Sequence, residues 1–404
     1  MDWIDAATAA DRLGVKPATL YAYVSRGVLK RRHDGRRSMF DAAEIEQLAR
    51  RGRPRNQPPE LVIESAVTAL GLDRPYYRGH DALALARTHA FETVADLLWN
   101  EPGSTGWTAD EAALRAAAAA QRSLPAGLLP LDRLQVIVTV LGASDNLRHQ
   151  LDPASVAATG RRLIAGLVDA LPVVGQSRST GLASGPPGSQ GAAGSVAARL
   201  WPRLTASDPA PALVDALRAA MVLLADHELA ASTLAARVAA SAKADPYAVV
   251  LTGLGVLGGP LHGGASYGAE RLLAEVTDPG LAPRVIGERV RRGERIPGFG
   301  HSVYKNGDAR GAALLDLVES AAPGHDRMAA ARAVLSEVRR RRLPEHNIDM
   351  ALATLAAVAG MVPGAGEAVF AIARTAGWLA HAMEEYTRGT LLRLRASYTG
   401  PSIT

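Results

Sequence analysis

The sequence contains no cysteine and few aromatic residues. None of its 404 residues is cysteine, which excludes disulfide frameworks, thiolate nucleophiles and cysteine-bound zinc or iron–sulfur centres. Aromatic residues make up only 4% of the chain, which argues against a sheet-rich fold. The absence of cysteine also suits a reducing compartment.

Segments that would direct a chain into a membrane or out of the cell are missing as well. No apolar run long enough to span a bilayer is free of glycine, proline and charge. The N-terminal stretch MDWIDAATAADRLG has no basic segment followed by an apolar one, so it does not have the pattern of a signal peptide. We therefore expect a soluble cytoplasmic protein.

Alanine-rich segments dominate what is present. The chain is 48% hydrophobic and 21% charged, which is typical of a globular protein, and its length predicts two or three domains. Segments such as EAALRAAAAA and LAARVAASA favour helix, and apolar residues recur at helical spacing from residue 61 onward. We expect an all-helical body, with a mobile surface loop in the Gly-, Ser- and Pro-rich segment 175–195.

Positive charge is concentrated in the first sixty residues. They hold 12 Lys and Arg against 8 Asp and Glu, whereas the rest of the chain holds 33 against 32. Two short helices and a hairpin that turns at Asp34-Gly35 are predicted, followed by a third helix. This order resembles the winged helix-turn-helix modules of the MerR and excisionase type. We expect such a module at residues 1–52 and a proline-rich linker at 53–60.

The resemblance implies binding to duplex DNA. In such modules the second helix enters the major groove and the wing contacts the backbone, where cations neutralise phosphates. The residues that would lie on or near that helix or in the wing are Thr19, Tyr21, Tyr23, Arg26, Lys30, Arg31, Arg32, Arg36 and Arg37. The alternative is a solvated basic face on a module that only mediates contacts between proteins.

Four stretches of the body concentrate residues suited to catalysis. LLADHELAAST carries His227, GGPLHGGAS carries His262, PGFGHSVYKNGDAR carries His301, and PEHNIDMALA places Asp349 just inside a helix start. Glycines beside His262 and before His301 let the backbone approach a ligand closely and leave each imidazole unobstructed. His227 taken alone is more typical of a core or capping histidine.

The order of these stretches resembles the citrate synthase family. ADHE, GPLHGGA, GFGHxVYKxxDxR and NID follow one another, and RTAGWLAH and RLRASYTG come after them. Upstream, YYRGHDALALARTHAFETVADLLWNE and LLPLDRLQVIVTVLGASD resemble early helices of that family. The resemblance covers residues 61–404. It implies a transferase that condenses acetyl-CoA, oxaloacetate and water to citrate and CoA, as in the tricarboxylic acid cycle.

Such a condensation needs three reacting groups. A base must remove a weakly acidic proton from the methyl carbon of the thioester, one donor must stabilise the enol, and a second donor must polarise the ketone. The resemblance implies that Asp349 is the base, His262 the donor to the thioester oxygen and His301 the donor to the ketone. It implies no metal and no cofactor, because the acyl-CoA is a co-substrate.

A dicarboxylic 2-oxo acid also needs fixed cations, and arginine is suited to bidentate carboxylate binding. The residues that match the carboxylate binders of the family are His227, Arg310, Arg374 and Arg393. Arg393 matches a residue that the family lends across a dimer interface, and Lys305 falls where the family has a cation near the CoA phosphates. The alternative for each of these cations is a surface ion pair.

The chain departs from the family at neutral positions near these residues. The family usually has Asn three residues after the ADHE histidine, and it has GGAN where this chain has GGAS. It also has the motifs DPR and RPR, and an aromatic residue and Ser-Gly soon after NVD. The residues found instead are Ala230, Ser266, Ala309, Leu394 and the stretch that begins at Met350. The reaction type is therefore better supported than the substrate.

The resemblance implies a mainly helical homodimer with two domains in each body. The large domain would span residues 61–264 and 358–404, the small domain would span 265–357, and the site would lie in the cleft between them. One alternative is a 2-methylcitrate synthase that uses propionyl-CoA. Another is a DNA-binding regulator whose synthase-derived body senses an acyl-CoA or an oxo acid.

Overall fold

The computed structural model of this chain describes most of its residues. The described ranges are 3–13, 15–25, 28–34, 37–42, 44–45, 48, 62–103, 106–125, 127–175, 194–304, 307–394 and residue 400. The chain divides into two units, Met1–Glu64 and Ser65–Thr404. The segment predicted to be a mobile loop and the predicted linker lie mainly or wholly outside the described residues.

The first unit contains helices and a small sheet. Its elements are β1 (Trp3–Asp5), α1 (Ala6–Leu13), α2 (Pro17–Ser25), β2 (Arg31–Asp34) and β3 (Arg37–Asp41), and the antiparallel strands lie in the order β1-β3-β2. Proline at the first position of α2 suits a helix start, since its missing N–H would have no partner there. Leu20, Leu29, Phe40 and Ile45 form the core with two alanines. The predicted helix pair and hairpin are confirmed, whereas most of the predicted third helix lies outside the described residues.

A second small sheet opens the larger unit. It consists of β4 (Thr68–Leu70), β5 (Pro75–Tyr77) and β6 (His80–Asp81), antiparallel and in that order. The expectation of an all-helical body is therefore wrong over this segment. Strands of two or three residues are too short for polar and apolar residues to alternate visibly, so the sequence does not reveal them.

Helices make up most of the larger unit, so the mainly helical fold class is confirmed. Aspartate side chains accept backbone N–H groups at several helix starts, among them Asp81, Asp110, Asp152 and Asp245, and so satisfy groups that a helix leaves unpaired. The helices are α4 (Ala82–Thr88), α5 (Phe91–Trp99), α6 (Glu111–Ala120), α7 (Pro130–Ser144), α8 (Pro153–Ala170), α9 (Val196–Leu204), α10 (Pro211–Leu224), α11 (Ala231–Ser241), α12 (Pro246–Leu257), α13 (Gly264–Glu275), α14 (Ala282–Arg291), α15 (Ala309–Ala321), α16 (Asp326–Arg340), α17 (Ile348–Val358) and α18 (Ala365–Arg388).

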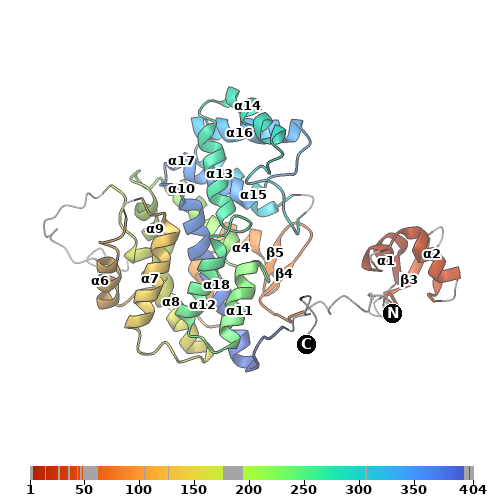
Figure 1. Ribbon diagram of the computed structural model, residues 1–404, viewed down its shortest axis with the longest axis horizontal. Coiled ribbons are helices and arrows are strands. Elements are labelled where there is room, and N and C mark those ends of the chain that lie inside the picture. The colour runs from red at the N-terminus through yellow and green to blue at the C-terminus, as the bar shows by residue number, and fades with distance from the viewer. Residues whose placement is uncertain are drawn as a thin grey trace. The chain divides into compact units, whose positions relative to one another are not determined.

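Helix α18 is the centre of this unit. It is buried along nearly its whole length and packs against α5, α8, α10, α11 and α12, in the middle of the unit as seen in Figure 1. A residue on α18 can therefore reach elements that are far apart in the sequence.

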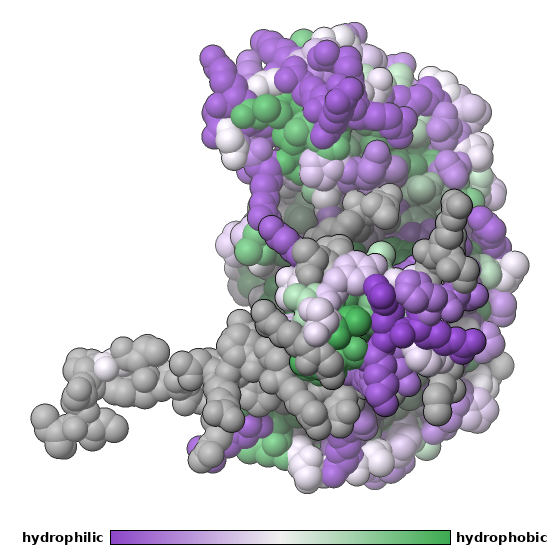
Figure 2. All heavy atoms as spheres, turned by 90° about the vertical axis from the view of Figure 1, so that its right-hand side faces the viewer, coloured by the Kyte–Doolittle hydropathy of each residue, from purple (hydrophilic) through white to green (hydrophobic). Residues whose placement is uncertain are grey.

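A second hydrophobic cluster lies at one end of the same unit, where Figure 1 shows α14 and α16. Leu272, Ile286, Val334 and Met350 belong to it, so α13, α14, α16 and α17 share a core of their own. In Figure 2 hydrophilic side chains cover much of this end, with hydrophobic ones between them. Among the described helices, none combines the length and apolar character needed to cross a membrane.

Candidate active site

The four stretches that carry His227, His262, His301 and Asp349 meet in the larger unit. His227 follows α10, His262 precedes α13, His301 lies in the loop before α15, and Asp349 lies in the first turn of α17. The rings of His227 and His301 are 5.3 Å apart, centre to centre. The positive charge of Arg374 contributes to the pKa of His227, of His262 and of Asp349, which places all three within its electrostatic reach.

The loop of His301 fixes the proton on that ring. The backbone N–H groups of Val303 and Tyr304 donate to Nδ1 of His301 at 3.0 and 3.1 Å. Since Nδ1 accepts, the proton of a neutral ring lies on Nε2, which can donate to a substrate. Gly298 and Gly300 have φ angles of 83° and 81°, so the glycines supply a left-handed turn that other residues rarely adopt.

Ser232 and Trp378 fix the proton of His262 in a similar way. Nε1 of Trp378 donates to Oγ of Ser232 at 3.2 Å, and Oγ lies 2.6 Å from Nε2 of His262. The hydroxyl of Ser232 is fully buried, and Nε2 of His262 is its acceptor among the described residues. The hydroxyl therefore donates to Nε2, and Nδ1 of His262 carries the ring proton. Burial, followed by the charge of Arg374, lowers the pKa of His262 to about 4. His262 is therefore a neutral donor at pH 7.

Asn347 positions Asp349 relative to the loop of His301. Its side chain accepts the backbone N–H of Asp349 at 3.0 Å and donates to the carbonyl of Gly300 at 2.9 Å. The carboxylate of Asp349 also accepts a hydrogen bond from the hydroxyl of Ser266. Burial raises the pKa of Asp349 to about 6, although the Ser266 hydrogen bond acts in the opposite direction. A carboxyl group with this pKa is ionised at pH 7 and is still basic enough to take a proton.

Two buried arginines lie at the same site. Arg310 is 2% exposed and donates from Nε and Nη2 to Asp308 at 2.9 and 2.8 Å. Burial of Asp308 opposes ionisation, but the nearby Arg310 charge holds the pKa of that carboxyl below its usual value. Arg310 thus keeps its charge, with its guanidinium oriented by the ion pair.

Arg374 is less completely paired. It is 1% exposed, and its Nε donates to the carbonyl of Leu224 at 2.8 Å. Its Nη1 and Nη2 are buried and have no hydrogen-bond partner among the described residues. Burial lowers the pKa of Arg374 to about 10, so the group stays charged at pH 7. An unpaired buried guanidinium is costly, and its presence indicates a site for an anion.

A buried network holds the turn that carries His227. Asp226 is fully buried, and its Oδ2 accepts the N–H of Glu228 and Nε2 of His381, both at 3.2 Å. Nη1 of Arg237 donates to Nδ1 of His381 at 2.7 Å, so the proton of a neutral His381 lies on Nε2 and points to Asp226. A Cβ atom at Gly377 would lie 2.2 Å from Oδ1 of Asp226, so only glycine allows this contact without a shift.

His227 itself is buried and hydrogen-bonded. Its Nε2 lies 3.0 Å from the hydroxyl of Tyr304. Burial, followed by the charges of Arg310 and Arg374, holds the pKa of His227 well below its usual value. The ring is therefore neutral, and it can contact an anion through a hydrogen bond rather than as a cation.

The structure does not bring every predicted residue together. Arg393 lies in an exposed segment after α18, and no hydrogen bond or ion pair joins it to the other site residues within the described part of this single chain. Lys305 lies outside the described residues. The sequence motifs contained Asp226, Tyr304 and His381 but gave no sign of their contacts. Ser232 stands five residues after His227, and only its spatial position reveals a role.

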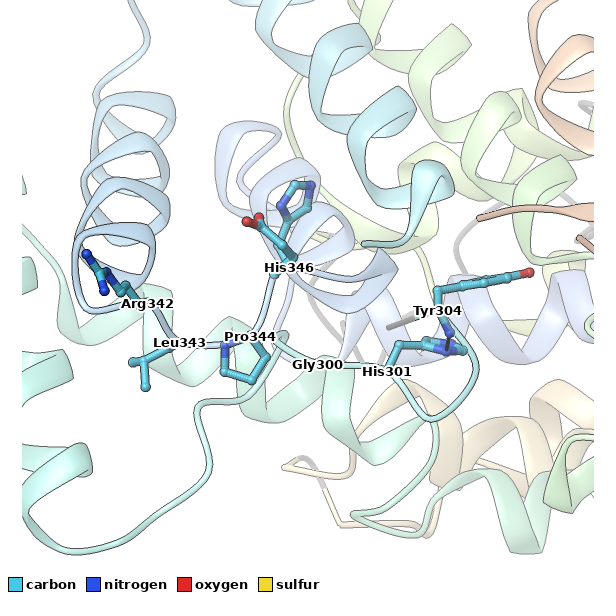
Figure 3. A pocket seen from close by; sticks show the side chains of 8 residues that line it. Gly300, His301, Tyr304, Arg342, Leu343, Pro344 and His346 are labelled. Atoms are coloured by element: carbon cyan, nitrogen blue, oxygen red, sulfur yellow. Dashed lines mark hydrogen bonds between the residues drawn. The ribbon is translucent and has the colours of Figure 1, made fainter. Parts of the chain in front are cut away.

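A pocket of about 450 Å³ opens beside His301. Figure 3 shows His301 and Tyr304 at one end of its lining and Arg342 at the other. The remaining lining residues are Gly300, Leu343, Pro344, Glu345 and His346. The pocket thus connects the loop of His301 with the segment that leads directly into Asn347 and Asp349.

The predicted DNA-binding residues of the first unit fall into three groups. Thr19, Tyr21, Lys30, Arg31 and Arg32 are exposed, with the guanidinium of Arg31 5.9 Å from the centre of the Tyr21 ring. Tyr23 packs against the core of the unit, which leaves less of it for a partner. The positions Arg26 and Arg36, and the side chain of Arg37, lie outside the described residues.

Comparison with known proteins agrees with the fold. Residues 60–395 match the family described as citrate synthase, C-terminal domain, and residues 3–53 match a helix-turn-helix domain. The chain belongs to the citrate synthase family, and it carries an N-terminal helix-turn-helix domain in addition.

Relatives with two different activities are similarly close. The chain is 30% identical to the citrate synthase of Haloferax volcanii, over 84% of this chain and 94% of that protein. It is also 30% identical to the 2-methylcitrate synthase of Mycobacterium tuberculosis, over 80% and 84% of the two chains. The chain is therefore related to citrate and 2-methylcitrate synthases alike.

Solved structures show the same fold. The citrate synthase of Pyrobaculum aerophilum has a TM-score of 0.70 at 23% identity, covering 93% of this chain and 96% of that one. The enzyme of Thermoplasma acidophilum has a TM-score of 0.69 at 23% identity, covering 86% and 96%. The latter was solved as a ternary complex with carboxymethyl coenzyme A and oxaloacetate.

Proposed function

We propose that this protein catalyses the condensation of acetyl-CoA with oxaloacetate to give citrate and CoA. The observation that carries the proposal is the buried guanidinium of Arg374, whose Nη1 and Nη2 have no partner among the described residues. It lies within electrostatic reach of two neutral histidines and a carboxyl base. A small oxo dianion would satisfy these groups while a base and two donors act on the reacting atoms.

The reaction would proceed in three steps. Asp349 removes a proton from the methyl carbon of acetyl-CoA, while Nδ1–H of His262 donates to the thioester oxygen and stabilises the enol. The enol carbon attacks the ketone carbon of oxaloacetate, whose oxygen is polarised by Nε2–H of His301 and takes up a proton as it becomes the hydroxyl of the product. The proton that Asp349 removed balances this uptake, so the base is ionised again. Water then hydrolyses the thioester and releases the thiol of CoA.

The remaining predicted residues would bind the substrates. Arg310 and Arg374 would hold the carboxylates of oxaloacetate as cations, and neutral His227 would hold one as a hydrogen-bond donor. The pocket beside His301 would take part of the acyl-CoA, with Lys305 near its phosphates. The division of the body at residues 264–265 and 357–358 would let a small domain close over the site and exclude water from the enol.

A homodimer would complete the site with Arg393 of a second copy. The exposed position of Arg393 supports this, since no hydrogen bond or ion pair joins it to the site within the described part of its own chain. Leu234 and Val238 of α11 are 37% and 46% exposed and, four residues apart, share one face of that helix. Such an apolar face is suited to burial against a partner.

A 2-methylcitrate synthase remains the second candidate. Ala230 and Ser266 stand where the family usually has asparagine, and both are smaller. Ala230 stands just before α11 and makes no side-chain hydrogen bond to the start of that helix, and Ser266 donates a hydrogen bond to the proposed base Asp349. A smaller residue leaves more room for the extra methylene group of propionyl-CoA, although one methylene alters selectivity by only about 1–3 kcal/mol.

Binding to duplex DNA is a proposed additional function of the first unit. The exposed cations Lys30, Arg31 and Arg32, together with the match to a helix-turn-helix domain, support it. The first unit would then bind DNA either while the larger unit acts as an enzyme, or in response to an acyl-CoA or an oxo acid that the larger unit binds as a sensor.

Release of free thiol by the purified full-length protein separates these readings. Acetyl-CoA and propionyl-CoA are each supplied with and without oxaloacetate, and Asp349→Asn serves as the inactive control. Release that requires oxaloacetate and is faster with acetyl-CoA supports the proposal, whereas faster release with propionyl-CoA supports the second candidate. No release with either acyl-CoA, from a protein that binds them, would contradict both enzymes and favour the sensor.

A further inference from the structure

Ser266 is a buried hydroxyl that contacts the proposed base. It lies in the first turn of α13, one turn after His262, and it is fully buried. Its Oγ donates to Oδ1 of Asp349, which lies on α17, and the two helices pack closely together. This is one of the positions at which the chain departs from the asparagine usual in the family.

The hydrogen bond distinguishes the two oxygens of the carboxylate. Oδ1 of Asp349 is occupied by Ser266, whereas Oδ2 has no hydrogen bond among the described residues. A carboxylate held at one oxygen is restricted in rotation, and the other oxygen keeps its lone pairs for a proton. The acyl methyl group would therefore meet Oδ2.

The same short segment also positions His262. The ring of His262 is held at Nε2 by Ser232, and the start of α13 follows directly. His262, the proposed donor to the thioester oxygen, and Ser266, which contacts the proposed base, are thus four residues apart at the start of α13. These two groups must act on neighbouring atoms of one substrate, so their relative position matters more than either position alone.

We propose that Ser266 is a positioning residue, and that its hydroxyl holds Oδ1 of the proposed base Asp349 and directs Oδ2 toward the acyl methyl group. This role deepens the proposed condensation and rests on it for its chemical meaning. The effect of Ser266 on the carboxylate of Asp349 can be measured without turnover.

The charges around Asp349 are consistent with this role. Burial is the strongest influence and raises the pKa of Asp349, and the Ser266 hydrogen bond is the next strongest and lowers it. From the other elements, Arg310 and Arg374 lower that pKa and Asp308 raises it. Since Ser266 opposes burial more strongly than any one of these charges, its loss should be visible in the titration of Asp349.

The test is the titration of Asp349 followed by carbon NMR of full-length protein labelled at the aspartate carboxyl groups. The spectrum of Asp349→Asn identifies the signal by its loss. Ser266→Ala should raise the pKa of Asp349 by about one unit or more, because a hydrogen bond to the charged form is removed. Ser266→Thr and Ser266→Asn, which keep a donor, should titrate near wild type.

Thr354→Val is the matched control. The hydroxyl of Thr354, which lies on α17, is fully buried like that of Ser266, but it donates to the carbonyl of Met350 one turn back in the same helix. This variant should leave the pKa of Asp349 unchanged. A pKa in Ser266→Ala within about 0.3 units of wild type, or an equal rise in Thr354→Val, would overturn the proposal.

Kinetics separate this role from the proposed function. Ser266→Ala should lower kcat about tenfold at pH 7, shift the acid limb of the pH profile upward and leave the KM for oxaloacetate unchanged. Ser266→Thr should restore the profile. Absence of condensation by the wild type would refute the proposed function, while the NMR titration would still decide whether Ser266 controls the carboxylate.

Discussion

The two units of this chain use cations in opposite ways. In the larger unit Arg310 and Arg374 are 2% and 1% exposed, and each is held by backbone or carboxylate contacts. In the first unit Lys30, Arg31 and Arg32 lie on the surface. The same charge is therefore buried and directed in one unit and solvated in the other.

This difference determines what each unit can recognise. A buried guanidinium in a fixed position attracts a small anion whose atoms match it, and salt screens that interaction little. Surface cations produce a field that acts on any polyanion and weakens as salt is added. Burial, rather than the number of cations, separates a substrate site from a surface suited to nucleic acid.

The largest effect is expected from Asp349→Asn, which removes the proposed base and leaves the cations in place. Thioester condensation should fall by about three orders of magnitude or more, measured as kcat. Because folding raises the pKa of this carboxyl from 3.8 to about 6, its ionisation destabilises the fold as pH rises through that range. The variant should therefore have a higher Tm than wild type at pH 7. Retention of more than about a tenth of the wild-type kcat would reject Asp349 as the base.

A smaller effect is expected from Arg374→Lys, which keeps the charge but loses the planar guanidinium. The KM for oxaloacetate should rise about a hundredfold, since the bidentate contact of a buried guanidinium with a carboxylate is lost, while the KM for the acyl-CoA stays within about threefold. Arg161→Lys is the matched control, because Arg161 is also buried and paired with Asp96 outside the site. Equal changes of KM in the two variants would remove Arg374 from substrate binding.

Arg393 tests whether a third cation comes from a second copy. Inactive Asp349→Asn chains mixed with inactive Arg393→Ala chains should regain up to about a quarter of wild-type activity, because half the dimers are mixed and each has one intact site. Thiol release after confirmed subunit exchange is the measurement. No recovery would place Arg393 in its own subunit's site or outside the chemistry.

The smallest effect on catalysis is expected from deletion of residues 1–56. Kcat should stay within about twofold, because no proposed catalytic residue lies in that segment, whereas binding of duplex DNA should be lost. Fluorescence anisotropy at low and moderate salt compares the truncated protein, full-length protein and a variant with Arg31, Arg32, Arg36 and Arg37 replaced by alanine. Identical curves for full-length and truncated protein would contradict DNA binding.

The sequence predicted candidate residues whose chemistry is specific, and the structure explains why it gave no sign of the residues that position them. A base or a ketone donor requires particular residue types in recognisable motifs, as with the proposed base Asp349 and the proposed donor His301. Their supports come from distant segments, as with Trp378, Ser232 and His262, which are brought together only by the packing of α18 on α11. A serine on an alanine-rich helix gives no sign of such a contact.

One departure from the family became interpretable only in three dimensions. Alanine replaces proline at position 309, and its N–H donates to the carbonyl of Asp73 at 3.1 Å. Proline has no N–H, so this bond between α15 and the segment joining β4 to β5 depends on the replacement. The same small sheet escaped sequence-based prediction because its strands are too short to alternate.

Calorimetric titration of oxaloacetate at about 50 and about 300 mM salt tests the central claim, that buried cations form a site for a small dianion. We predict one oxaloacetate bound per chain, an affinity that changes by less than about threefold between the two salt concentrations, and loss of binding in Arg374→Lys. No binding to the wild type, or equal affinity in wild type and Arg374→Lys, would contradict the account.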